Sequence, residues 1–199
     1  MTVGEVGAVV LAAGLSTRMG QPKMVLPWGK VTIIEKVVTT LREAGIEKIV
    51  VITGGAHQEV LKALNGYYVT IIFNPQYHNG EMLNSLQAGL RALPPDVRGA
   101  LIVLGDQPFI QRETIETVVQ AFLETSSQLV IPSFQMRRGH PWLIARQLWQ
   151  EVLEIKPPET LRSFLQANHE KITYVVVDTP TIIWDIDTPE DYEKRKPRN

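Results

Sequence analysis

The segment VGAVVLAAGLSTRMGQPK, from Val6 to Lys23, decides the fold of this chain. Its first six residues, Val6 to Leu11, form a short and continuous apolar run that is rich in valine. Such a run is typical of a strand that is buried on both faces of a parallel sheet. Two alanines and Gly14 follow at once, and then a polar segment that carries two cations. The pattern predicts a buried strand that ends in a loop with accessible backbone.

Strands and helices are expected to alternate along the rest of the chain. Apolar runs of the same kind predict strands at residues 48–53, 69–73, 100–104, 129–131 and 172–177. Apolar residues at helical spacing predict helices near residues 34–41, 60–64, 83–93, 115–122, 148–153, 161–165 and 189–196. The segment 134–143 looks irregular and is expected to hold a hairpin. This alternation predicts an α/β fold, a mostly parallel sheet with helices on both faces.

Length and composition narrow the class of protein. The chain has 199 residues and no repeat or linker-like segment, so we expect one domain over residues 1–199, with an ordered core to residue 193 and a polar tail at 194–199. Twenty basic and 21 acidic residues give a net charge of −1, which disfavours general nucleic-acid binding. The absence of cysteine excludes disulfides, a thiolate nucleophile and iron–sulfur clusters.

The membrane and secretory classes are also disfavoured. No apolar run approaches the roughly 20 residues that a membrane-spanning helix needs. The first seven residues lack the basic region of a signal peptide. We therefore expect a cytoplasmic protein without membrane contact.

The loop after the first strand has the composition of a polyphosphate site. In open α/β sheets, ligands bind beyond the carboxyl ends of the strands. Small residues at 12–14 let a ligand approach the backbone, and Ser16 adds a hydroxyl. Arg18 and Lys23 add two cations, which suit a polyphosphate. The P-loop and dinucleotide-binding glycine patterns are absent. The alternative is an ordinary strand–helix connection with two solvated cations.

Two acidic segments suggest a metal site. Asp106 directly follows a predicted buried strand, and Asp185 and Asp187 flank Ile186 so that an extended chain would point both to one side. Magnesium favours one or two carboxylates together with phosphate and water oxygens. The alternatives are that Asp106 only begins a turn, and that Asp187 only caps a helix beginning near Pro189.

Histidines and serines offer weaker signals. The four histidines have no metal-ligand spacing. His140 follows Arg137 and Arg138 in a basic loop that either binds an anion or is an ordinary surface loop. Ser16 and Ser85 lie outside any nucleophile elbow, so a hydrolase triad is unsupported.

Four motifs resemble a known superfamily of transferases. The pattern Leu11-Ala-Ala-Gly-x-Ser-x-Arg-Met-Gly-x-x-Lys23 resembles the opening signature of the nucleotidyltransferases that activate sugars, isoprenoid precursors and the molybdenum cofactor. Gly105-Asp-Gln-Pro108 resembles their metal-binding turn. Arg138-Gly-His-Pro141 and Asp185-Ile-Asp-Thr-Pro-Glu-Asp191 are narrower, and the combination resembles the molybdenum cofactor cytidylyltransferase branch of the MobA-like NTP transferases. The motifs extend over nearly the whole chain.

The resemblance implies a Rossmann-like three-layer α/β/α sandwich of the nucleotide-diphospho-sugar transferase type, with a nucleoside triphosphate as substrate. It implies Mg²⁺ as cofactor, bound by Asp106 with Asp187 as second ligand, or Asp185 in its place. Arg18, Lys23 and Asp106 would be catalytic, and Arg138 and His140 would bind the acceptor. The implied nucleotide-binding residues are Leu11, Ala12, Ala13, Gly14, Ser16, Arg18, Lys23, Gly80 and Ser85.

Two departures from the related guanylyltransferases imply a pyrimidine nucleotide. Those enzymes usually have Gly-Gly where this chain has Ala13-Gly14, and an aspartate where it has Pro22. The expected reaction is transfer of CMP from CTP to the terminal phosphate of the pterin cofactor, with transient contact to a recipient molybdoenzyme or its chaperone. The alternatives are a cytidylyl- or other nucleotidyltransferase acting on a sugar phosphate or methylerythritol phosphate, a non-catalytic nucleotide-binding module, and a docking partner of a molybdoenzyme.

Overall fold

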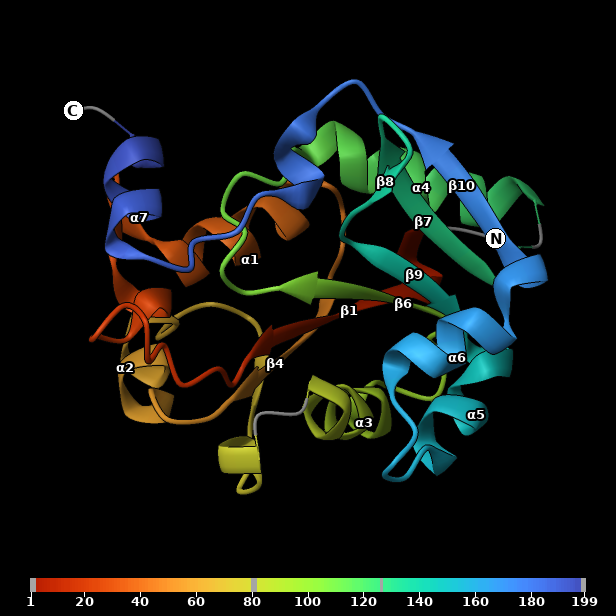
Figure 1. Ribbon diagram of the computed structural model, residues 1–199, viewed down its shortest axis with the longest axis horizontal. Coiled ribbons are helices and arrows are strands. Elements are labelled where there is room, and N and C mark those ends of the chain that lie inside the picture. The colour runs from red at the N-terminus through yellow and green to blue at the C-terminus, as the bar shows by residue number, and fades with distance from the viewer. Residues whose placement is uncertain (1–2, 80–81, 126, 198–199) are drawn as a thin grey trace.

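The protein is built around one twisted, mostly parallel sheet (Figure 1). The computed structural model describes residues 3–79, 82–125 and 127–197. In these residues the sheet has the strand order β10–β7–β9–β6–β1–β4–β5, with β8 paired to β7. Its strands are β1 (Val6–Ala12), β4 (Lys48–Thr53), β5 (Thr70–Phe73), β6 (Gly99–Leu104), β7 (Leu129–Phe134), β8 (Arg137–Arg138), β9 (Trp142–Ala145) and β10 (Ile172–Val176).

Strand β1 lies in the interior of the sheet, as its continuous apolar sequence predicts. All seven of its residues are buried, and it pairs in parallel with both β4 and β6. Strand β5 pairs in parallel with β4, and β10 with β7. Strand β9 runs antiparallel between β6 and β7. The carboxyl ends of β1, β4 and β6 therefore meet at one edge, where the predicted site residues begin.

Helices cover both faces of the sheet, so the three-layer α/β/α prediction is confirmed (Figure 1). Helices α1, α2 and α4 pack on one face, and α3, α5 and α6 pack on the other. No helix in the described part of the chain is long and apolar enough to cross a membrane. The helices are α1 (Ile33–Glu43), α2 (His57–Ala63), α3 (Met82–Ala92), α4 (Arg112–Thr125), α5 (Trp149–Glu154), α6 (Leu161–Ala167) and α7 (Pro189–Arg195).

Local sequence signals define both ends of α1. Thr32 and Glu35 form a reciprocal capping box, and Gly45 after the helix has a φ of +81°. At the other end of the chain, Thr188 caps α7 through Asp191. Asp187 is therefore not the cap of this helix. Helix α7 ends at Arg195, two residues into the segment expected to be a polar tail.

Strand β7 is longer than the sequence predicts, because it continues through Pro132 to Phe134. A proline usually ends a central strand, since it lacks the N–H of the ladder. Here β9 pairs with Leu129 and Val130, and β8 pairs only from Ser133 onward. Pro132 itself pairs with Val175 of β10, and its carbonyl accepts a hydrogen bond from the N–H of Gly139 on the other side. Strand β7 therefore continues through the proline because partners hold it on both sides, and the predicted hairpin follows with β8.

A glycine sets how closely α3 approaches the sheet. A Cβ atom placed on Gly89 would lie 2.2 Å from Cγ1 of Val9 in β1. Only glycine allows this contact, because real carbon atoms do not approach so closely. The N-terminal turns of α3 are thereby held beside the carboxyl end of β1.

Candidate active site

The loop after β1 folds back on itself through Ser16. Ser16 has a φ of +52°, and its carbonyl accepts a hydrogen bond of 3.0 Å from the N–H of Met19. Its side-chain oxygen accepts a hydrogen bond of 3.2 Å from the backbone N–H of Lys23. Met19 is buried, so the loop is fixed at its tip as well as at its two ends. Ser16 therefore positions the backbone of Lys23 rather than facing outward as a free hydroxyl.

An apolar cluster brings the loop and the C-terminal acidic segment together. It contains Met19 from the loop, Trp28 and Ile33 from the following segment, and Ile186 between the two aspartates. The N–H of Ile186 also donates a hydrogen bond of 3.2 Å to the carbonyl of Asp106. The cluster and this hydrogen bond join the loop after β1, the Asp106 turn and the segment around Ile186 at the carboxyl end of β6, although more than 70 residues separate them in sequence. The carboxylates are adjacent because Ile186 is anchored.

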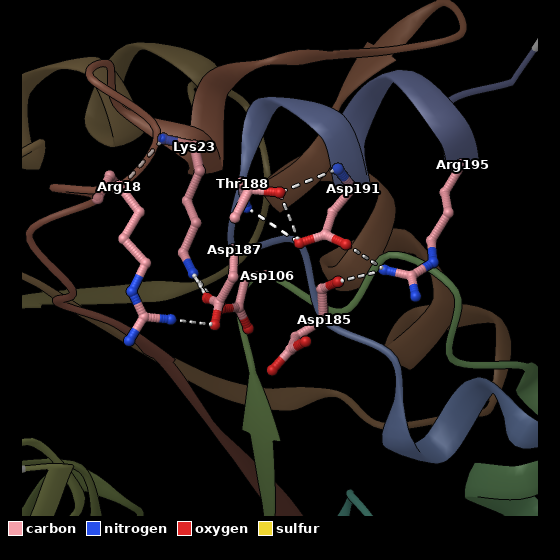
Figure 2. Close-up of polar contacts among 9 residues, drawn as sticks. Arg18, Lys23, Asp106, Asp185, Asp187, Thr188, Asp191 and Arg195 are labelled. Atoms are coloured by element: carbon pink, nitrogen blue, oxygen red, sulfur yellow. Dashed lines mark hydrogen bonds and ion pairs between the residues drawn. The ribbon is translucent and has the colours of Figure 1, made fainter.

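Lys23 lies between two carboxylates (Figure 2). Its Nζ atom is 2.5 Å from Oδ2 of Asp106 and 3.0 Å from Oδ1 of Asp187. The other oxygen of Asp187 accepts a hydrogen bond of 3.0 Å from Nη1 of Arg18. Only 10% of the Lys23 side chain is exposed, whereas 73% of the Arg18 side chain is exposed. The sequence-predicted phosphate and metal residues therefore form one connected charge cluster.

The electrostatics of the cluster favour a charged lysine. Burial alone would lower the pKa of Lys23, but the carboxylates of Asp106 and Asp187 outweigh it and raise that pKa. Partial burial, together with repulsion from Asp187 and then Asp106, raises the pKa of Asp185. Asp185 faces the other two carboxylates without a cation of its own in the described contacts, since the guanidinium of Arg195 binds its backbone carbonyl instead.

A cavity of about 370 Å³ opens beside this cluster. It has one polar end, at Lys23 and Asp106, and mostly apolar walls. Its lining residues are Leu11, Ala13, Gly14, Leu15, Lys23, Met24, Tyr77, Met82, Ser85, Leu104 and Asp106. A pocket with apolar walls and a few convergent charges is typical of a small-molecule site.

The cavity contains some, but not all, of the predicted nucleotide residues. Leu11, Ala13, Gly14 and Ser85 line it, together with Lys23. The remaining predicted residues, Ala12, Ser16 and Arg18, do not line it. The Oγ atom of Ser85 accepts a hydrogen bond of 3.0 Å from Asn74. Gly80 lies outside the described residues.

Five lining residues are outside the set of individual site residues that the resemblance implies, namely Leu15, Met24, Tyr77, Met82 and Leu104. Leu104 had a signal, since it is the last residue of β6 before the Gly105–Asp106 turn. Tyr77 follows the Asn74–Pro75 turn, where an aromatic ring gives no signal of its own. Which apolar side chains line a cavity depends on tertiary packing, and motifs of charged and small residues do not predict that packing.

The two predicted acceptor residues lie on β8 and just before β9, outside the cavity. Arg138 is exposed, and its guanidinium carbon lies 5.3 Å from the ring centre of Tyr174. Burial lowers the pKa of His140 to about 4, so His140 carries no charge near neutral pH. The basic character expected of this loop therefore comes from Arg137 and Arg138.

The side chains of the site that could bind a metal ion are the carboxylates of Asp106 and Asp187. Among the residues that the structure describes, no three histidine, cysteine or carboxylate side chains form a cluster suited to a metal ion. Asp106 and Asp187 approach the same ammonium, so their oxygens converge on one point. A pair of this kind needs oxygens from a bound phosphate and from water to complete a metal shell.

Comparisons with known proteins find relatives along nearly the whole chain. The chain is 28% identical over 200 residues to the molybdenum cofactor cytidylyltransferase of Escherichia coli K12, with 98% of each chain covered. Its fold matches Rv0371c of Mycobacterium tuberculosis H37Rv with a TM-score of 0.84 and 24% identity, over 97% of this chain and 98% of that one. A manganese complex of Rv0371c matches with a TM-score of 0.78 and 24% identity over the same shares.

A more distant fold match is the 4-diphosphocytidyl-2C-methyl-D-erythritol synthase of Anaerococcus prevotii DSM 20548. Its TM-score is 0.77 at 18% identity, with 98% of each chain covered. The family model for the MobA-like NTP transferase domain matches residues 8–172, which include the loop after β1 and Asp106. The chain is therefore a nucleotidyltransferase that belongs to the MobA-like NTP transferase family.

Proposed function

We propose that this protein transfers CMP from CTP to the terminal phosphate of molybdopterin, the pterin of the molybdenum cofactor, and releases pyrophosphate with Mg²⁺ as cofactor. The observation that carries the proposal is the junction of Lys23, Asp106 and Asp187 at the polar end of the cavity. A cation and two carboxylates at this place suit a metal-bound triphosphate. The cytidylyltransferase from Escherichia coli supports the choice of acceptor.

The cavity walls support a nucleotide at this position. Leu11, Ala13 and Gly14 line it from the end of β1, and Tyr77 lines it from the turn after β5. Apolar walls suit the base and ribose, while Lys23 reaches toward the phosphates. Ala13 is the residue at which the related guanylyltransferases usually have glycine, so its methyl group supports CTP over GTP.

Asp106 and Asp187 are the residues that would hold Mg²⁺. Their carboxylate oxygens are hard ligands, which magnesium favours, and both converge on one point. When bound, the ion neutralises charge on the phosphate oxygens. Lys23 now forms ion pairs with both carboxylates, so its ammonium must transfer to the phosphates when the nucleotide enters.

The proposed reaction needs alignment more than acid–base chemistry. An oxygen of the acceptor phosphate attacks the α-phosphorus of CTP, a new P–O bond forms, and the bond to the bridging oxygen breaks. Pyrophosphate leaves with the electron pair of that bond. The acceptor phosphate is ionised near neutral pH, since its second pKa is about 6, so no general base is required. Lys23 and Arg18 orient the phosphates and counter their negative charge.

The proposal is tested by measuring pyrophosphate release with matched substrate pairs. CTP, GTP, ATP and UTP are each combined with molybdopterin, with methylerythritol phosphate and with a sugar 1-phosphate. We expect the highest kcat/KM for CTP with molybdopterin. A higher value for another acceptor would reject the proposed substrate, and nucleotide binding without turnover of any pair would reject catalysis.

A further inference from the structure

Strand register places a row of side chains on the face of the sheet that forms the nucleotide cavity. Leu104 lines the cavity, and Ile102 two residues before it packs in the core beneath α3. Trp142 on β9 is the register partner of Ile102, so it points to the same face. Trp142 packs against the same apolar core as Leu104. The row therefore continues from the cavity onto β9.

The same row extends two strands further, to the edge of the sheet. Tyr174 on β10 pairs with Ile131, which is buried in the core under α3, α5 and α6. Arg138 on β8 pairs with Ser133, two residues after Ile131. Residues two apart on a strand share a face, so Arg138 and Tyr174 lie on the same side as the cavity. The Arg138 guanidinium beside the Tyr174 ring agrees with this placement.

Helices leave this part of the face open. Figure 1 shows α5 and α6 near the beginning of β10, at the opposite end of that strand from β8. Tyr174 is accordingly 44% exposed and Val176 78% exposed. The side chain of Ser133 is small, so Arg138 reaches across it to Tyr174. The open face thus presents a guanidinium and an aromatic ring rather than a closed core.

Unpartnered polar atoms mark the middle of the row. Nε1 of Trp142 and Nε2 of His140 are buried, and neither has a hydrogen-bond partner among the described residues. The two rings stack with centroids 4.6 Å apart and an angle of 16° between their planes. Buried polar atoms without partners are rare in native proteins and call for a water or ligand to complete them. Two ring nitrogens between the cavity and Arg138 are therefore available to a water or ligand.

The length of the row restricts what can occupy it. From Leu104 on β6 to Tyr174 on β10, three strand spacings cover about 14 Å. A single sugar or polyol phosphate is too short to contact both ends. A fused, flat heterocycle carrying a phosphate arm can place its phosphate beside the cavity and its ring near Arg138 and Tyr174.

We propose that Trp142, Arg138 and Tyr174 form an acceptor platform that selects an extended, planar heteroaromatic phosphate. The inference rests on the proposed function and deepens it, because it assigns Tyr174 and Trp142 as specificity-determining residues. Tyr174 and Arg138 contact the flat ring of the acceptor, and Trp142 lies between that ring and the nucleotide. The platform disfavours compact acceptors, which leave these contacts unmade.

Binding of neopterin 3′-monophosphate tests the platform separately from catalysis. The quenching of the probe's pterin fluorescence measures this binding. Tyr174→Ala and Arg138→Ala should each weaken binding of this probe about tenfold, the size of one lost aromatic or cation contact. Tyr174→Phe keeps the ring and should stay within about twofold of wild type. CTP affinity should be unchanged in all three variants. The matched control is Tyr68→Ala, an exposed tyrosine outside the platform.

The outcomes separate failure of the platform from failure of the proposed function. Unchanged probe binding in Tyr174→Ala and Arg138→Ala, with molybdopterin still turned over, rejects the platform alone. A second outcome rejects both the platform and the proposed function. In it, the protein turns over methylerythritol phosphate, Tyr174→Ala does not change that turnover, and the pterin probe does not bind. Loss of CTP affinity in Tyr174→Ala would show general disruption of the fold and also rejects the assignment.

Discussion

The Nζ atom of Lys23 lies 2.5 Å from Oδ2 of Asp106, although 83 positions separate the two residues in the chain. The same ammonium reaches Asp187, so one cation neutralises two carboxylates. Without nucleotide, Lys23 serves as the internal counter-ion of the proposed metal ligands. Under the proposed function, triphosphate binding would offer Lys23 a new anion and free the carboxylates, which would couple metal binding to nucleotide binding.

The first prediction concerns turnover of a Lys23→Met variant. Loss of one preorganised cation at developing phosphate charge should reduce kcat by roughly 10²–10³. The unbranched methionine keeps most of the side-chain volume, so the protein should remain folded. Pyrophosphate release and circular dichroism measure the two properties. Lys30→Met is the matched control, because Lys30 is exposed and outside the cavity. Turnover of Lys23→Met within threefold of wild type would contradict the assigned role.

The second prediction concerns metal affinity. Asp106→Asn replaces one anionic ligand by a neutral amide, and it should weaken Mn²⁺ binding in the presence of CTP by at least about tenfold, or about 1.4 kcal/mol. Electron paramagnetic resonance of free Mn²⁺ measures this affinity without turnover. Asp178→Asn removes an exposed carboxylate elsewhere and should leave it unchanged. Equal Mn²⁺ affinity in wild type and Asp106→Asn would remove Asp106 from the metal site.

Local patterns predict the fold and the charged residues of the site. The apolar run at β1 and the small residues after it are local signals, and they place Lys23 near the end of a central strand. The approach of Asp187 to Asp106 is suggested by the two acidic segments and by the family resemblance, but no local pattern shows how the two carboxylates are brought together. Its physical cause is the burial of Ile186 and its hydrogen bond to Asp106, neither of which has a local signal.

Tertiary context also explains what the sequence does not predict. Strand β7 passes through Pro132 because β10 pairs with it on one side and the N–H of Gly139 binds its carbonyl on the other. The strand propensity of the residues themselves does not include these partners. The sequence places His140 in a basic loop, but burial lowers its pKa to about 4 and leaves it neutral near pH 7. Both differences arise from contacts between segments that are separated in the chain.

The third prediction concerns pH and stability, and it depends on His140. Burial lowers the pKa of His140 to about 4 in the folded protein, against 6.5 for an unperturbed histidine in the unfolded chain. Between these values the unfolded chain binds more protons, so stability falls as pH falls. The contribution is complete above about pH 6.5 and is lost toward pH 4. From pH 7 to pH 5 the loss should be about 2 kcal/mol.

Urea unfolding of wild type and His140→Gln at several pH values measures this contribution. The free energy of unfolding of wild type should fall more steeply below pH 6.5 than that of the variant. Between about pH 7 and pH 8 the two curves should be parallel, because His140 is neutral in both states there. Parallel curves between about pH 5 and pH 7 would mean that His140 is not buried as a neutral ring.

The fourth prediction tests how the packing of α3 controls the cavity. Alanine in place of Gly89 gains about 1 kcal/mol of helix propensity. Its Cβ would meet Val9 Cγ1 at 2.2 Å, so α3 must move away from β1, and overpacking of this kind costs about 1–3 kcal/mol. Since α3 carries Met82 and Ser85 on the cavity wall, CTP affinity should fall severalfold together with stability.

A double-mutant cycle shows whether the contact with Val9 is the cause. Val9→Ala removes the two methyl groups that the new Cβ would meet, so Val9→Ala/Gly89→Ala should be more stable than the sum of the single effects predicts. A coupling of at least about 0.5 kcal/mol between the two sites is expected from urea unfolding. CTP affinity should recover in parallel, because α3 can return toward β1. If Gly89→Ala alone were as stable as wild type and bound CTP equally well, the close approach of α3 to β1 would not be what shapes the cavity.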